Sequence, residues 1–116
     1  MMTVTIYHNP RCSKSRQTLA LLIDNGIKPK IVEYLNRPPT QKELSRILRL
    51  LNLAPRDLMR KKESEYKSMG LDNLNLDDSS LIAAMISHPI LMERPIVTTE
   101  NNAAIGRPPE NVLSII

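Results

Sequence analysis

The first 35 residues carry the feature that most constrains the fold. The spacing of their apolar residues changes from that of a strand to that of a helix, and then returns to that of a strand. Residues 3–7 (TVTIY) alternate as a half-buried strand does, and residues 30–35 (KIVEYL) predict a second strand. Between the two runs, Leu19, Leu22 and Ile23 have the spacing of one helix face. A strand, a helix and a strand in this order normally form a parallel pair with a right-handed crossover.

The middle of the chain, at about residues 38–92, is expected to be a series of helices. Thr40 and Glu43 have the spacing of a capping box, and an amphipathic apolar pattern follows them. Asp78 or Ser79 is expected to cap a later helix. This segment therefore predicts a helical insertion with no strand of its own.

Two short strands are predicted after the insertion, at residues 96–99 and 103–106, around an Asn-rich turn. Pro109 is expected to begin a last helix. Without the helical middle, the order is βαβ followed by ββα, which is the order of a thioredoxin-like core. We therefore expect one α/β domain over residues 1–116, with a four-stranded mixed sheet and a helical insertion between the second and third strands.

The chain has a single cysteine, Cys12, so an internal disulfide is excluded. A lone thiol fits a reducing compartment, and we expect a cytoplasmic protein. If Cys12 does redox chemistry, the second thiol must come from another molecule. The net charge of +4 comes from scattered basic residues, and three tyrosines are the only aromatics, so no nucleic-acid partner is expected. No apolar run is long enough to span a membrane.

The stretch HNPRCSKSR, residues 8–16, places Cys12 in the turn between the first strand and the first helix. Unpaired N–H groups and the helix dipole at such a position favour a thiolate and can cradle an oxyanion. Arg11, Lys14 and Arg16 add positive charge. The alternative is a buried spectator cysteine, but a turn rich in Arg and Lys is not an apolar core.

Other kinds of site are poorly supported. One cysteine and two distant histidines, His8 and His88, do not make a closed zinc site, so no metal is expected. A phosphatase-type loop would need more glycine around the cysteine. Arg60, Arg94 and Arg107 are candidate anion ligands because each lies at a predicted element boundary. Their spacing alone does not place them beside the thiol.

Four separated segments, YHNPRCSKSRQTL, LMRKKESEYKSMGL, HPILMERPIV and IGRPPENVL, together resemble the glutaredoxin-coupled arsenate reductase family, ArsC. The resemblance covers essentially the whole chain in the right order. NPRCSKSR is most similar to an arsenate-reductase-like branch of that family. The resemblance implies a thioredoxin-like fold with a helical insertion, in agreement with the element order.

The resemblance also implies roles for single residues. Cys12 matches the family nucleophile, and His8 and Ser15 are expected to stabilise its thiolate. Pro95 matches the cis-proline that thioredoxin-like folds place beside the thiol. The arginines that bind the oxyanion match Arg60, Arg94 and Arg107.

The implied reaction is the reduction of arsenate to arsenite in arsenic detoxification, with glutathione as co-substrate and glutaredoxin as the resolving partner. No tightly bound cofactor is expected, and the protein is expected to be a monomer. One alternative is an Spx-like redox or transcription regulator that binds RNA polymerase. Such regulators typically carry C-x-x-C at this turn, whereas this chain has Cys12 and Ser15 there. Another alternative is a thiol-dependent reductase of a different substrate.

Overall fold

The computed structural model describes residues 3–116, so the first two residues of the predicted domain lie outside the described residues. The chain forms two compact units. A sheet unit takes in residues up to Arg37 together with Arg94–Ile116, and a helical unit takes in Pro38–Glu93.

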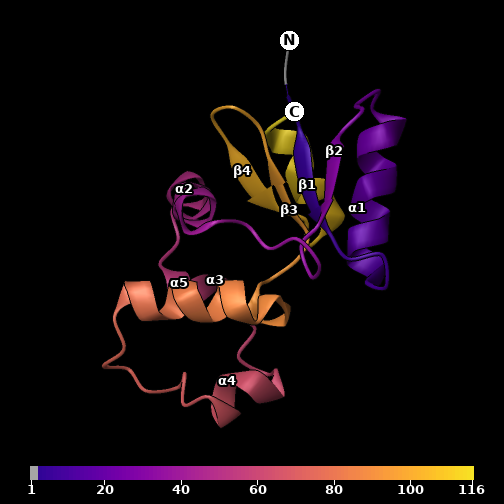
Figure 1. The fold of residues 1–116 in the computed structure, drawn as a ribbon. Helices are drawn as coiled ribbons and strands as arrows, with labels where there is room; N and C mark the ends of the chain where they lie inside the picture. The colour runs from indigo at the N-terminus through magenta and orange to yellow at the C-terminus, as the bar shows by residue number, and fades with distance from the viewer. Residues whose placement is uncertain (1–2) are drawn as a thin grey trace. The chain divides into compact units, whose positions relative to one another are not determined.

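The sheet unit contains one four-stranded mixed sheet in the order β2-β1-β3-β4 (Figure 1). Its strands are β1 (Thr5–His8), β2 (Lys30–Glu33), β3 (Ile96–Thr98) and β4 (Ala103–Ile105). Strand β1 runs parallel to β2 and antiparallel to β3, and β3 runs antiparallel to β4. This arrangement confirms the predicted thioredoxin-like fold, with strands that are one or two residues shorter than predicted.

Helix α1 (Ser13–Asp24) and the 3₁₀ helix η2 (Pro109–Ser114) complete the sheet unit. The core of this unit is apolar and draws on both ends of the chain. Its buried members are Val4, Ile6, Leu22, Val97 and Val112.

One prediction about this core was wrong, because the Ile23 side chain is 57% exposed. The buried face of α1 follows Thr18 and Leu22, which are both fully buried. Ile23 lies one residue further along, about 100° around the helix from Leu22, and therefore faces away.

The helical unit contains α2 (Gln41–Leu51), α3 (Pro55–Leu58), α4 (Ser64–Ser68), α5 (Asp78–Ser87) and the 3₁₀ helix η1 (Pro89–Leu91). The predicted capping box is present: the Glu43 N–H donates to Thr40 Oγ1, and Glu43 Oε1 accepts from the Thr40 N–H. The predicted cap of α5 was wrong. Asp77 is the N-cap, and its Oδ1 accepts from the Ser80 N–H at 2.8 Å.

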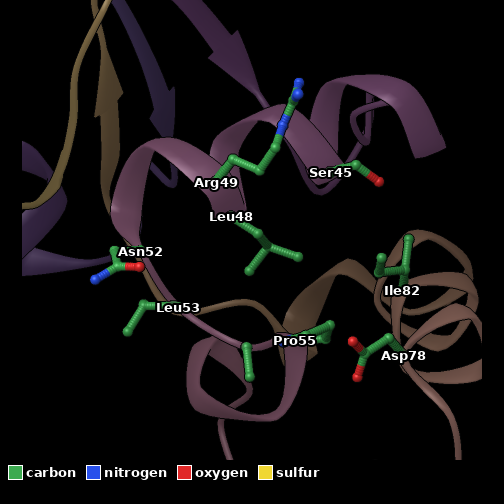
Figure 2. A pocket seen from close by; sticks show the side chains of 9 residues that line it. Ser45, Leu48, Arg49, Asn52, Leu53, Pro55, Asp78 and Ile82 are labelled. Carbon is green, nitrogen blue, oxygen red and sulfur yellow. The ribbon is translucent and has the colours of Figure 1, made fainter.

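Helix α5 packs against α2 and α3, and the three helices surround a pocket of about 510 Å³ (Figure 2). None of the predicted site residues lines this pocket. Within residues 3–116, no helix is long and apolar enough to cross a membrane.

Candidate active site around Cys12

The turn between β1 and α1 holds Cys12 at the N-cap of the helix, with φ −94° and ψ 123°. Asn9 stabilises this turn through two hydrogen bonds. Its carbonyl accepts from the Cys12 N–H at 3.0 Å, and its Oδ1 accepts from the Arg11 N–H at 3.0 Å. The Cys12 side chain makes no capping hydrogen bond, so the sulfur is not used to close the helix. Cys12 is 8% exposed and lies at the end of α1 where the helix dipole favours an anion.

Ser15 joins the end of β1 to the first turn of α1. Its hydroxyl is fully buried, accepts from the Asn9 N–H at 3.0 Å and lies 2.6 Å from His8 Nδ1. A hydroxyl has one proton and two lone pairs, so Ser15 Oγ can bind the Asn9 N–H and His8 Nδ1 at the same time. Within residues 3–116, neither His8 nor Ser15 hydrogen-bonds to the Cys12 sulfur.

His8 is only 6% exposed, and this burial lowers its pKa below the ordinary value of 6.5. The Arg16 charge lowers the His8 pKa further, whereas Glu33, its register partner on β2, partly opposes the shift. The lowered pKa favours the neutral form of the ring at neutral pH.

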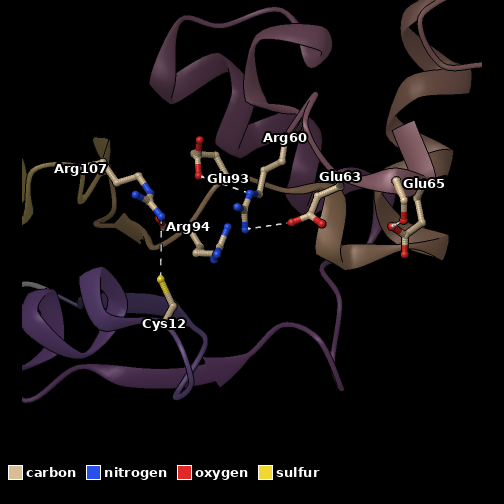
Figure 3. A network of polar contacts seen from close by, with 8 residues as sticks. Cys12, Arg60, Glu63, Glu65, Glu93, Arg94 and Arg107 are labelled. Carbon is tan, nitrogen blue, oxygen red and sulfur yellow. Dashed lines mark hydrogen bonds and ion pairs between the residues drawn. The ribbon is translucent and has the colours of Figure 1, made fainter. Parts of the chain in front are cut away.

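Arg107 lies over the thiol. Its Nη2 is 3.9 Å from Cys12 Sγ, which Figure 3 marks with a dashed line. Its Nε donates to the Arg94 carbonyl at 2.9 Å. That carbonyl belongs to the Arg94–Pro95 peptide bond, which is cis, as is the Arg107–Pro108 bond. The guanidinium is therefore held between the backbone before β3 and the sulfur, and it can stabilise negative charge on either the thiolate or a bound anion.

Gly106 sets the path of the chain just before Arg107. A Cβ at this position would lie 2.5 Å from Thr18 Oγ1 and 2.9 Å from Pro95 Cγ. The Gly106 N–H also donates to the Pro95 carbonyl at 2.9 Å. Only glycine lets the strand end approach α1 and Pro95 this closely.

The other two predicted arginines have different surroundings. Arg94 begins the second segment of the sheet unit, and its Nε and Nη1 atoms are buried. Arg60 belongs to the helical unit, two residues after the end of α3, where it pairs with Glu63 at 3.4 Å and Glu93 at 4.0 Å (Figure 3). Its share in anion binding stays a prediction.

No group of three or more histidine, cysteine or carboxylate side chains gathers as a metal site within residues 3–116. The site is instead one thiol at a helix N-terminus, a guanidinium against its sulfur, and a neutral histidine behind the turn. Such a site can attract a small oxyanion and attack it with sulfur.

Comparison with known proteins assigns the chain to a family. The profile of the ArsC family matches residues 7–115. The chain belongs to the ArsC family. Arsenate reductase of Neisseria meningitidis serogroup A is 49% identical, with both chains covered in full, and that of Haemophilus influenzae is 50% identical, with 99% and 100% covered. The structure of an arsenate reductase from Vibrio cholerae matches with a TM-score of 0.96 and 51% identity, covering 99% of this chain and 98% of that one.

Two residues that shape this ArsC site were missed by sequence reasoning, Asn9 and Gly106. The Asn9–Pro10 pair is a turn signal, and asparagine often bonds to backbone N–H groups nearby in the chain. Gly106 stands directly before a candidate arginine in a chain with three glycines. These two signals could have indicated that both residues determine the course of the backbone around the site.

Proposed function

We propose that this ArsC protein reduces arsenate to arsenite, with the Cys12 thiolate as nucleophile. The observation that carries the proposal is the contact of Arg107 Nη2 with Cys12 Sγ at the N-terminus of α1. The names of relatives at about 50% identity supply the substrate. Helix N–H groups and the guanidinium favour both the thiolate and an arriving oxyanion, so the same site both binds the oxyanion and activates the thiol.

Arg107 and Arg94 are the arginines of the sheet unit that we expect to hold the arsenate oxygens, and Arg60 is the third expected ligand. A guanidinium presents a planar pair of N–H donors that matches two oxygens of an oxyanion. His8 and Ser15 act through the turn: their hydrogen bond, together with that of Asn9, fixes the backbone that carries the nucleophile.

The chemistry needs two electrons from thiols. In the first step the Cys12 sulfur attacks arsenic and forms an S–As(V) bond, while one oxygen leaves as water. A glutathione sulfur then attacks the Cys12 sulfur, and the S–As electron pair stays on arsenic, which leaves as arsenite. The two sulfurs, each oxidised by one electron, remain as a Cys12–glutathione disulfide.

The last step regenerates Cys12 and requires another protein. A thiolate must open the mixed disulfide, and the chain has no second cysteine to provide one. We propose glutaredoxin as that partner, with glutathione as a co-substrate and no tightly bound cofactor. We also propose that the protein acts as a monomer in the cytoplasm.

The test is arsenate reduction by the purified protein with glutathione and glutaredoxin, with Cys12→Ser as the control. Without glutaredoxin we expect the reaction to stop at one glutathione adduct on the Cys12 peptide, which mass spectrometry detects. Sustained turnover with no resolving protein would contradict the external relay. A folded protein that forms no adduct would instead favour a binding role, such as that of a regulator.

A further inference from the structure

A pocket of about 430 Å³ lies in the sheet unit beside the turn that carries Cys12. One wall is formed by residues 8–11, from the end of β1 to the residue before the nucleophile. The other wall is formed by Glu33, Leu35 and Asn36 at the end of β2. A cavity of this size lies within the range that encloses small organic ligands, about 300–1,000 Å³.

Three polar side-chain groups of this pocket are unused by the protein. Within residues 3–116, the Arg11 guanidinium, the Glu33 carboxylate and the Asn36 amide form no hydrogen bond or ion pair. Arg16 shows the contrast, because its Nη1 donates to the Pro10 carbonyl at 2.9 Å. A cation and an anion thus line one pocket without pairing with each other, which suits a ligand that carries both signs of charge.

We propose that this pocket binds glutathione, the thiol co-substrate, with Glu33 accepting from its ammonium group and Arg11 pairing with one of its carboxylates. The inference rests on the proposed function for the identity of the thiol. Glutathione is a tripeptide with one ammonium, two carboxylates and two peptide groups, and the Asn36 amide and the Asn9 Nδ2 group are available for the peptide groups. Pro10 and Leu35 provide apolar surface beside them.

The position of the pocket fits delivery of a thiol. Its first wall runs directly into Cys12, and the Cys12 N–H is bonded to the Asn9 carbonyl in that wall. Arg107 follows the end of β4 and does not line the pocket, and its side chain contacts the sulfur. Oxyanion and thiol would therefore approach Cys12 through different residues, so that binding one does not displace the other.

The direct test uses S-methylglutathione, which binds as glutathione does but cannot react. We expect NMR titration of the protein to shift the backbone amide signals of His8, Asn9, Arg11 and residues 33–36. Arg11→Ala and Glu33→Gln should each weaken binding by about two- to fivefold, the range of exposed ion pairs. The matched control is Arg37→Ala, which removes an exposed positive charge next to the pocket but outside its lining.

A second measurement compares thiols in arsenate reduction. Arg11→Ala and Glu33→Gln should raise the KM for glutathione but not the KM for 2-mercaptoethanol, which has no charges. Equal losses with both thiols, or shifts confined to residues outside the pocket, would overturn the inference while arsenate reduction stands. Conversely, binding of S-methylglutathione in the pocket of a protein that does not reduce arsenate would support the pocket and contradict the proposed function.

Discussion

At the scale of single residues, the nucleophile depends on a neighbour that never touches it. The Ser15 hydroxyl binds both the Asn9 N–H and His8 Nδ1, and all of these contacts lie within the turn that positions Cys12. The geometry of the site is therefore held by buried hydrogen bonds behind the thiol, where removal of one oxygen leaves two groups without a partner.

We predict that Ser15→Ala lowers the free energy of unfolding by about 1–3 kcal/mol, because the Asn9 N–H and His8 Nδ1 lose their buried partner. The same change should slow alkylation of Cys12 by iodoacetamide, since the turn is no longer fixed. Ser13→Ala is the matched control, an exposed serine in the same helical turn. Equal effects of the two substitutions on stability and alkylation would refute this role of Ser15.

At the scale of elements, Arg56 of α3 holds the irregular part of the helical unit together. Its Nη1 donates to Tyr66 Oη and to the Leu71 carbonyl, both at 2.6 Å, and its Nη2 donates to the Asn73 carbonyl at 2.9 Å. One side chain thus joins three short segments, α3, α4 and the loop after α4.

We predict that Arg56→Lys destabilises the protein by about 1–3 kcal/mol, because an ammonium keeps the charge but cannot reproduce the spread of the guanidinium donors. Urea unfolding measures the loss, and hydrogen exchange of the amides of residues 69–76 should speed up most. Arg49→Lys on the exposed side of α2 should change neither quantity. Uniform exchange across the helical unit in Arg56→Lys would count against a local clamp.

Elements set by short-range chemistry were predictable, and contacts between distant elements were not. The Thr40–Glu43 capping box needs only residues three apart, and the sequence predicted it correctly. The predicted N-cap of α5, Asp78 or Ser79, was wrong because Asp77 directly before them can cap a helix equally well. The contact of Arg107 with Cys12 joins residues 95 apart, and spacing along the chain carries no information about such a contact.

At the scale of the whole molecule, stability should fall in mild acid because of His8. Burial lowers its pKa from the ordinary 6.5, so the unfolded chain binds more protons than the folded chain once the pH drops below 6.5. The free energy of unfolding should therefore decrease as the pH falls from 6.5 toward the lowered pKa. Glu33 and Arg16, the charges that act on the ring, oppose each other and leave burial as the main cause.

Urea midpoints at pH 7.5 and pH 5.0 measure this decrease. His8→Gln should reduce the difference between the two midpoints, because glutamine does not titrate. His88→Gln, at the exposed C-cap of α5, is the control and should keep the wild-type difference. If His8→Gln retains the full difference, carboxylates rather than His8 account for the acid sensitivity.

The sheet unit is built from the two ends of the chain, and this has a consequence for biosynthesis. A ribosome completes Cys12, β1 and β2 early, but β3, β4 and Arg107 emerge only after the whole of Pro38–Glu93 has been made. Until then β1 lacks its antiparallel neighbour and the thiol lacks its guanidinium. The nascent chain therefore carries a cysteine that is not yet part of an active site, and the reactive centre assembles only after the helical unit has been synthesised.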